Sequence, residues 1–143
     1  MSALARYFNA AGKSVCGYDR ISTTLTDELV SEGIEIHFEE NITLIPEPIS
    51  NPADKNEVLI VYTPAVPETN KELKYFKEND FEVRKRAEVL SSITEKKYTI
   101  AIAGTHGKTT ISSMVSHILR YANVDCIALL GGISQNYNTN FLF

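Results

Sequence analysis

The sequence predicts an α/β fold with a mainly parallel sheet, and three observations indicate it. Strand-like apolar segments alternate along the chain with amphipathic helical segments. The strand-like residues 14–18 end at Asp19, and an acidic residue at that place is typical of dinucleotide-type folds. Residues 99–103, also strand-like, lead into a glycine loop and then into a helical pattern.

The individual elements follow from the periodicity. A helix is expected over residues 2–11, with Gly12 as its stop. The later elements are expected in the order strand 14–18, helix 24–33, strand 34–38, proline-containing loop 39–56, strand 58–62, helix 68–79, strand 81–84, helix 87–93, strand 99–103, helix from 108, and strand 126–130. That last strand is expected to end at Gly131 and Gly132, and residues 135–140 are polar without a period.

A charged turn at residues 95–97 indicates a boundary between two domains. Residues 1–96 are expected to form a Rossmann-like parallel-sheet domain. Such a domain has a strand and a glycine-rich turn before its first helix, and neither precedes residues 2–11, so we expect its first strand to be missing. Residues 97–143 have the strand, loop and helix that are typical of the beginning of a P-loop ATPase domain.

The glycine loop has the composition of a phosphate-binding loop. Glycines let backbone N–H groups converge on a phosphate, and a helix N-terminus adds partial positive charge. Lys108 is placed to reach terminal phosphates, and the Thr109 hydroxyl to bind Mg²⁺. The loop is shorter than the general pattern, which has a glycine where this chain has Ile102. The alternative is an ordinary strand-to-helix turn with a capping threonine, which does not explain a lysine after the second glycine.

The overall composition argues against several classes of function. A formal net charge of −4 gives no electrostatic basis for binding nucleic acid or an anionic membrane. The chain has no apolar run near the roughly 20 residues of a membrane span and no signal-peptide pattern, so a cytoplasmic protein with reduced Cys16 and Cys126 is expected. No metal-ligand spacing joins these cysteines to a histidine. We expect His37 and His117 to be surface or core residues without function.

The short loop Gly-Thr-His-Gly-Lys-Thr-Thr resembles the ATP loop of the Mur ligase family, the ATP-dependent amide ligases of peptidoglycan synthesis. Residues 1–5, 63–66 and 85–88 are similar to segments of the family's UDP-binding domain. The loop with His106 is similar to two kinds of member: those that join L-alanine to UDP-N-acetylmuramate and those that recycle the murein tripeptide. Residues 1–4 and 22–27 resemble the first kind more closely.

This resemblance implies an enzyme with ATP and Mg²⁺ as cofactors and UDP-N-acetylmuramate and L-alanine as substrates, without nucleic acid or membrane insertion. ATP would phosphorylate the sugar-linked carboxylate, and the amino group of L-alanine would attack the acyl phosphate. The resemblance implies Lys108 as the catalytic residue and Thr109 as the Mg²⁺ ligand. It implies ATP binding by Gly104, Thr105, His106, Gly107, Lys108, Thr109 and Thr110.

A UDP-sugar site is implied as well, and its residues have structural alternatives that stay open. Asp19 either binds the nucleotide or is an ordinary turn residue, and Arg86 either binds a phosphate or caps a helix. Gly131 and Gly132 either let the backbone approach the substrate or simply end a strand. His106 either contacts substrate or only shapes its loop. The full set implied for the UDP-sugar is Asp19, Thr63, Pro64, Ala65, Arg86, Gly131 and Gly132.

The resemblance also implies that much of the enzyme lies outside these 143 residues. The family's central domain continues with a glutamate and a histidine at the metal, and a C-terminal domain closes over ATP. We therefore expect a fragment of a longer ligase that is inactive alone. The alternatives are a fragment of a tripeptide-recycling ligase and a nucleotide-binding module without ligation chemistry.

Overall fold

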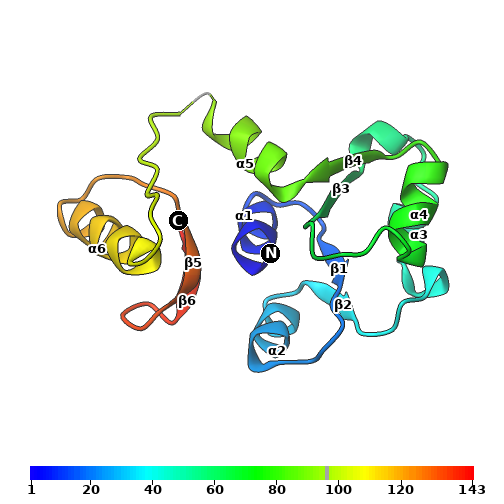
Figure 1. Cartoon of the computed structure of the whole chain (residues 1–143), viewed down its shortest axis with the longest axis horizontal. Coiled ribbons are helices and arrows are strands. Elements are labelled where there is room, and N and C mark those ends of the chain that lie inside the picture. The colour runs from blue at the N-terminus through cyan, green and yellow to red at the C-terminus, as the bar shows by residue number, and fades with distance from the viewer. Residues whose placement is uncertain (96) are drawn as a thin grey trace. The chain divides into compact units, whose positions relative to one another are not determined.

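The computed structural model describes residues 1–95 and 97–143, which divide into two compact units. Unit 1 consists of Met1–Ser14 and Thr99–Phe143, and unit 2 consists of Val15–Tyr98. Figure 1 colours the chain from its N-terminus to its C-terminus, so that unit 1 combines its blue and its yellow-to-red parts. The predicted domain boundary at residue 96 lies outside the described residues.

Unit 2 contains two pairs of parallel strands. β1 (Cys16–Tyr18) pairs with β2 (Glu35–His37), and α2 (Thr24–Ser31) connects them. β3 (Leu59–Tyr62) pairs with β4 (Glu82–Lys85), and α4 (Lys71–Glu78) connects them. Each pair is therefore a strand–helix–strand unit of the kind that builds parallel sheets.

The two pairs are separate two-stranded sheets within the described part of the chain. In the Rossmann strand order, the first strand lies between the second and the fourth. The second and third strands of that order correspond to β1 and β2, and the fourth and fifth to β3 and β4. The break in the sheet therefore falls where the sequence predicts a missing first strand, and the α/β, Rossmann-like prediction is confirmed.

The core of unit 2 is aromatic and lies over the second pair. The rings of Phe76 and Phe81 meet edge to face with centroids 5.1 Å apart. Ile45 and Val58 complete this buried cluster. Ile45 comes from the segment predicted as a loop, which contains η1 (Ile42–Leu44), α3 (Glu47–Ser50) and η2 (Lys55–Glu57). The last helix of the unit, α5 (Arg86–Thr94), follows β4 directly.

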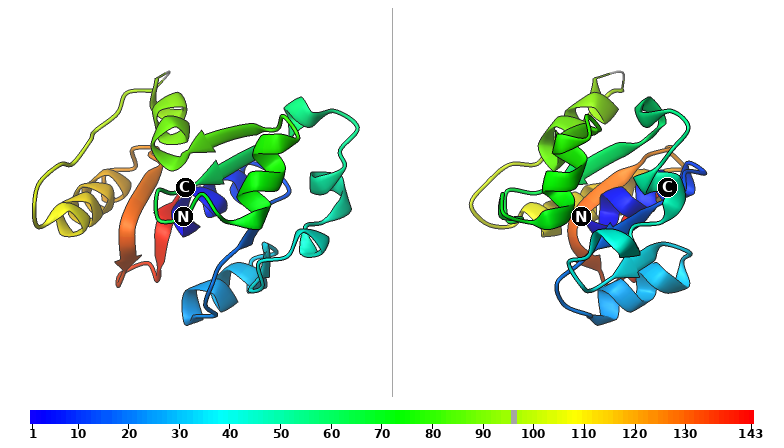
Figure 2. Two further views of the ribbon diagram at one scale, coloured as in Figure 1. Left: turned by 45° about the vertical axis from the view of Figure 1, so that its right-hand side comes forward. Right: turned by 90° about the vertical axis from the view of Figure 1, so that its right-hand side faces the viewer.

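Unit 1 is an antiparallel hairpin that contacts two helices. β5 (Ala128–Ser134) pairs with β6 (Thr139–Leu142), and α6 (Lys108–Tyr121) packs on β5. Figure 2 shows this helix and the hairpin from two further directions. The other helix, α1 (Ser2–Ala10), packs on β6.

A short polar chain fixes α1 to β6. The buried Arg6 donates from Nη1 to Oδ1 of Asn140 at 2.8 Å, and Nδ2 of Asn140 donates to Oγ of Ser2 at 2.7 Å. Asn140 is itself 5% exposed, so these hydrogen bonds satisfy polar groups that have little access to water.

Most predicted helices and strands are confirmed to within a few residues, but two predictions in unit 1 are wrong. Residues 99–103 form no strand, because no described strand lies beside them to share a ladder. The strand predicted to end at Gly131 and Gly132 runs through both of them to Ser134. Residues 135–140, which are polar and without a period, form a turn, in which Asn138 has φ of 49°, and the start of β6.

The third sheet is therefore antiparallel, whereas the sequence predicts a mainly parallel fold. No helix in the described part of the chain is both long and apolar enough for a membrane span.

Candidate functional site

The predicted phosphate loop bends at its two glycines. Gly104 has φ of 154° and Gly107 has φ of 76°, values that side-chain-bearing residues rarely adopt. A Cβ atom on Gly104 would lie 3.4 Å from the carbonyl oxygen of His106, so the backbone folds closely over itself there. Gly107 is also the N-cap of α6, which joins the bend directly to the helix.

The N-terminus of α6 is open. No side chain caps it among the described residues. The first N–H groups of any α-helix lack intrahelical acceptors, and the dipole of a helix of 14 residues adds partial positive charge at this end. Lys108 and Thr110 of the first turn are exposed, and Thr109 is half-buried. This end of the helix therefore offers donors to an anion.

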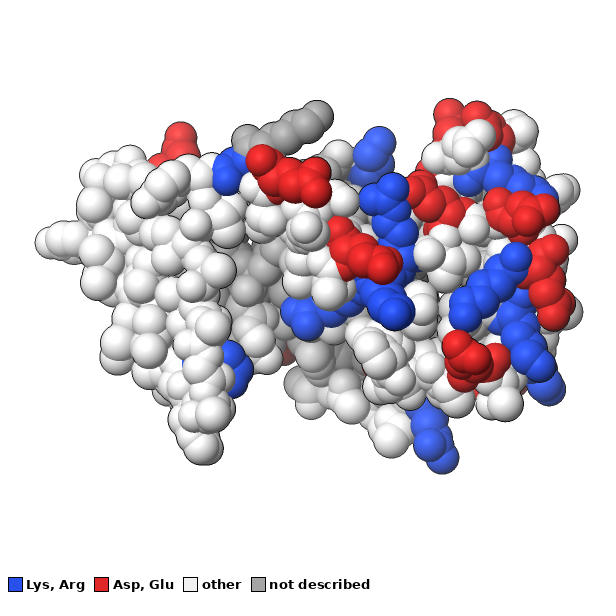
Figure 3. Space-filling model, turned by 45° about the horizontal axis from the view of Figure 1, so that its top comes forward, with Lys and Arg blue, Asp and Glu red and all other residues white. Residues whose placement is uncertain are grey.

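The Lys108 side chain folds back over the loop. Its Nζ donates to the carbonyl oxygen of Gly104 at 2.6 Å and to that of Thr105 at 3.1 Å. Residues 99–143 contain only one other Lys or Arg, Arg120, and a single carboxylate, Asp125. Figure 3 shows Lys, Arg, Asp and Glu side chains gathered on one side of the view and sparse on the other. Lys108 is thus the one cationic side chain of the loop.

Thr109 faces strand β5. A Cβ atom on Gly131 would lie 3.2 Å from Thr109 Oγ1, and one on Gly132 would lie 3.5 Å from Thr109 Cγ2. The structure therefore brings these two glycines, predicted for the UDP-sugar, against the predicted Mg²⁺ ligand. The side chains of Thr105, His106 and Thr110 are exposed and make no hydrogen bond to other described residues.

The described residues supply few ligands for a metal ion. They contain no group of three or more His, Cys, Asp or Glu side chains that could hold one. At the loop, the Thr109 hydroxyl is a single neutral oxygen. Mg²⁺ keeps several water ligands and commonly takes others from substrate phosphates. The loop therefore fits a Mg²⁺ ion that arrives with a polyphosphate better than a free ion.

The other predicted UDP-sugar residues follow the carboxyl ends of parallel strands, the edge at which such sheets bind ligands. Asp19 follows β1 and is exposed, and its Oδ1 accepts from the backbone N–H of Ile21 at 3.3 Å. Thr63 follows β3 and begins a turn in which its carbonyl accepts from Val66 N–H at 3.0 Å. Within that turn, Pro64 and Ala65 are exposed.

Arg86 is the first residue of α5, directly after β4, and its Nε is buried without a hydrogen-bond partner among the described residues. The alternative for Arg86 is that its side chain caps a helix. At this helix end the capping side chain is instead Glu88, whose carboxylate accepts from Lys85 N–H at 2.7 Å. No hydrogen bond or ion pair between described residues joins Asp19, Thr63 and Arg86 to one another.

The sequence does not predict a polar link between β2 and α4. Nε2 of His37 lies 3.0 and 3.1 Å from the two carboxylate oxygens of Glu72, and Oε1 of Glu72 also accepts from Asn41 N–H at 2.9 Å. The His37 ring also lies beside that of Tyr18, with centroids 5.7 Å apart. A carboxylate on an otherwise apolar helix face, next to the buried Leu73, is the one sequence signal for this link.

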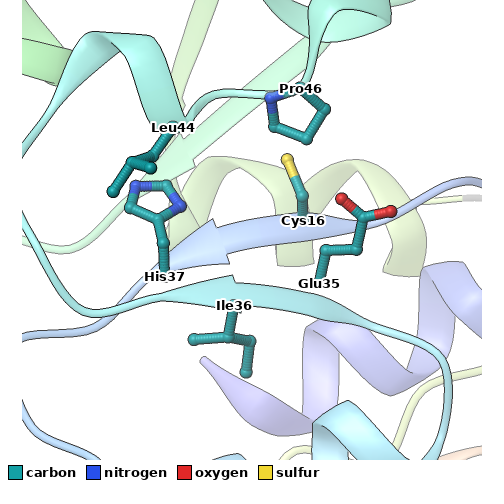
Figure 4. Close-up of a pocket in the computed structure, with 6 residues that line it drawn as sticks. All are labelled: Cys16, Glu35, Ile36, His37, Leu44 and Pro46. Atoms are coloured by element: carbon teal, nitrogen blue, oxygen red, sulfur yellow. The ribbon is translucent and has the colours of Figure 1, made fainter.

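A cavity of about 210 Å³ lies beside this link, at the β1–β2 pair. Its lining residues, labelled in Figure 4, are Cys16, Glu35, Ile36, His37, Leu44 and Pro46. Cys16 and Glu35 are partners in the ladder. Burial raises the pKa of the Cys16 thiol, and the carboxylates of Glu35 and Glu72 raise it further. The thiol is therefore held in its neutral, unreactive form.

Comparison with known proteins supports the sequence resemblance. Residues 1–98 match the model of the Mur ligase family, catalytic domain. Over 142 residues, the chain is 52% identical to the UDP-N-acetylmuramate–L-alanine ligase of Porphyromonas gingivalis and 54% identical to that of Parabacteroides distasonis. These alignments cover 99% of this chain and 30% of each relative.

Solved structures resemble the chain as well. The UDP-N-acetylmuramate–alanine ligase of Thermotoga maritima superposes with a TM-score of 0.86 at 27% identity, over 99% of this chain and 31% of that one. The murein peptide ligase of Psychrobacter arcticus superposes with a TM-score of 0.77 at 28% identity, over 96% of this chain and 28% of that one. The chain thus spans about 30% of the length of the curated relatives it matches. By its family match and its fold, the chain belongs to the Mur ligase family.

Proposed function

We propose that the chain is part of an ATP-dependent amide ligase that joins L-alanine to UDP-N-acetylmuramate in peptidoglycan synthesis. The observation that carries this proposal is the identity of 52–54% across 142 residues to relatives with that name. A tripeptide-recycling ligase is the second candidate, supported by the structural likeness to the murein peptide ligase at 28% identity. A nucleotide-binding module without ligation chemistry is the third.

The reaction we propose has two steps. The muramate carboxylate attacks the γ-phosphate of ATP, which forms an acyl phosphate and releases ADP. The neutral amino group of L-alanine then attacks the acyl carbon, the amide bond forms, and inorganic phosphate leaves with one proton lost from the amine. No side chain acts as a covalent nucleophile, so the protein positions the substrates and neutralises charge.

In this proposal the loop residues from Gly104 to Thr110 bind ATP. Lys108 moves from the carbonyl oxygens of Gly104 and Thr105 to the γ-phosphate, where its charge stabilises the transfer. The open N-terminus of α6 supplies backbone N–H donors. The Thr109 hydroxyl binds the Mg²⁺ ion that accompanies ATP, and this ion supplies further charge neutralisation when bound. His106 keeps both of its alternatives, a substrate contact or a purely structural role.

The UDP-sugar is assigned by the same proposal to Asp19, Thr63, Pro64, Ala65 and Arg86, with Gly131 and Gly132 near the reacting end. Residues 1–96 are the UDP-sugar domain and residues 97–143 begin the ATP domain. Under this division, helix α1 lies in the sequence of the UDP-sugar domain but packs on β6, which lies in the sequence of the ATP domain. We further propose a cytoplasmic enzyme that acts in cell-wall biogenesis, cell shape and division, and that binds neither nucleic acid nor the membrane interior.

The experiment is a ligation assay on the intact ligase that contains this sequence. UDP-N-acetylmuramate, ATP and Mg²⁺ are supplied with either L-alanine or the free murein tripeptide, and the products are identified by mass. We expect the alanine adduct and one inorganic phosphate per turnover. Preference for the tripeptide would support the recycling ligase instead. Nucleotide binding without either product would support the third candidate, a nucleotide-binding module without ligation chemistry.

A further inference from the structure

We propose that Gly131 is a positioning residue for Thr109: its lack of a side chain leaves Oγ1 of Thr109 free to adopt the position in which it binds a nucleotide-associated Mg²⁺ ion. This inference rests on the proposed function, since it requires that the loop binds ATP with Mg²⁺.

The backbone conformation of β5 does not require glycine at residues 131 and 132. Gly12, Gly33, Gly104 and Gly107 have positive φ angles, but Gly131 and Gly132 do not. Alanine or a β-branched residue could therefore adopt the backbone at Gly131, and glycine within a strand is less favourable than alanine. A glycine inside a strand also leaves space for a close neighbour.

That neighbour is the Thr109 hydroxyl. A Cβ atom at residue 131 would approach Oγ1 to 3.2 Å, which is closer than such contacts normally are, so the hydroxyl would have to shift by a few tenths of an ångström. At residue 132 the distance to Thr109 Cγ2 is 3.5 Å, an ordinary van der Waals contact. Threonine cannot easily move its hydroxyl alone, because its methyl group turns with it about the same bond.

An irregularity in the ladder places Gly131 at this point. Leu129 pairs with Phe141 and Ser134 pairs with Thr139, so four β5 residues lie opposite the single residue Asn140. Such bulges bend a strand and change the direction of its side chains, and they are common beside active sites. The bulged part of β5 is the part that meets the first turn of α6.

A shift of the hydroxyl matters because of the ion it would bind. Mg²⁺ requires near-ideal octahedral geometry at about 2.0–2.1 Å, so a ligand displaced by a few tenths of an ångström is a poor one. Residues that orient a metal ligand typically affect metal affinity by about 10–100-fold when they are changed. The effect is expected on Mg²⁺-dependent nucleotide binding and not on the binding of ATP alone.

The test measures the affinity of the intact ligase for ATP with and without Mg²⁺, by calorimetry. In Gly131→Ala, we expect the enhancement of ATP affinity by Mg²⁺ to fall by about tenfold, while affinity without Mg²⁺ changes by less than about twofold. The matched control is Gly17→Ala, also within a strand and without positive φ, where no atom lies within 4 Å of the added Cβ.

A rescue variant separates positioning from general damage. Serine lacks the methyl group that restricts the side chain of threonine, so in Thr109→Ser the hydroxyl can reach the ion from a second rotamer that a new Cβ does not contact. The double variant Gly131→Ala/Thr109→Ser is expected to recover the enhancement to within about twofold of Thr109→Ser alone. If Gly131→Ala does not fold, recovery of folding in the double variant supports the same contact.

Three results would overturn the inference: an unchanged Mg²⁺ enhancement in Gly131→Ala, equal losses with and without Mg²⁺, or no recovery in the double variant. A wild-type ligase that does not bind ATP would instead refute the proposed function, so the two failures are distinguishable.

Discussion

The ammonium group of Lys108 lies 2.6 Å from the carbonyl oxygen of Gly104, within its own loop. The positive charge is thus neutralised in part by backbone dipoles, and in the proposed function the ammonium group exchanges these carbonyl oxygens for a phosphate. This relationship means that the side chain is held near the place where we propose that it acts.

Replacing Lys108 by alanine in the intact ligase should lower turnover by about 100-fold or more, because one charge on the transferring phosphate is lost. The thermal midpoint should change little, because the side chain is exposed. The control is Lys74→Ala on α4, which removes another exposed lysine, far along the chain from the loop. Near-normal turnover of a folded Lys108→Ala protein would contradict the assignment.

Glu72 is expected to stabilise unit 2 through the backbone of Asn41 and the ring of His37. Glu72→Ala leaves two donors on half-buried residues without this acceptor, which should cost about 1–3 kcal/mol. Glu72→Gln keeps an acceptor for Asn41 N–H and should cost less. Thermal melting of the intact ligase measures both as a lowering of the melting temperature.

The matched control for this change is Glu78→Ala, an exposed carboxylate on the same helix, which should change stability by no more than about 0.5 kcal/mol. If Glu78→Ala and Glu72→Ala lower the melting temperature equally, the link between β2 and α4 contributes nothing.

Cys16 should alkylate more slowly than an ordinary thiol. Burial and the carboxylates of Glu35 and Glu72 raise its pKa in the folded protein, so it forms less thiolate than an ordinary thiol at the same pH. Because the folded-state pKa lies above the unfolded one, the associated stability is fully present below the unfolded pKa. It is lost as the pH rises through the folded pKa.

The measurement for Cys16 is the rate of its reaction with iodoacetamide between pH 7 and pH 10.5, followed by peptide mass spectrometry. The same residue in the urea-unfolded protein is the reference. Identical pH profiles in the two states would show that the cavity wall has no effect on the thiol.

The 143-residue chain on its own should be only marginally folded. One buried central strand contributes about four apolar side chains at about 1.5–3 kcal/mol each, comparable with the net stability of a whole domain. No strand of the described residues joins β1 to β3, and the apolar residues Ile111, Met114 and Ile118 of α6 are 47%, 59% and 64% exposed. Unpaired strand edges also favour aggregation.

Thermal unfolding and hydrogen exchange of residues 1–143, with and without Mg²⁺ and ATP, test this expectation. We expect a broad transition and fast exchange at β1. A sharp cooperative transition with slow exchange in Cys16–Tyr18 would contradict it. Alanine ligation by the chain alone would contradict it more strongly.

Features of the fold that depend on neighbouring residues could be predicted from the sequence. The periodicity of residues 108–121 predicts α6, and the two glycines with the following lysine predict the loop. Features that depend on contacts between residues far apart in the sequence could not be predicted from it. Residues 99–103 have the composition of a strand, but a strand also needs a neighbour, which composition does not reveal.

The candidate site shows the same limit. The contact of Gly131 with Thr109 and the link of His37 to Glu72 join residues that are more than 20 positions apart. In a sequence, a glycine pair after a strand is equally consistent with the end of the strand and with the close approach of another side chain to its backbone. Only the position of α6 on β5 distinguishes these possibilities.

The hydrogen bond between Arg6 and Asn140 joins residues 134 positions apart, and it has a consequence for synthesis. At about 5–20 residues per second, a ribosome needs roughly 7–27 seconds to make the chain between these two residues. Helix α1 is therefore synthesised well before its partner strand β6, and the whole of unit 2 is made in between. During that interval the apolar side of α1, with Leu4 and Ala3, must stay exposed or be shielded by a chaperone.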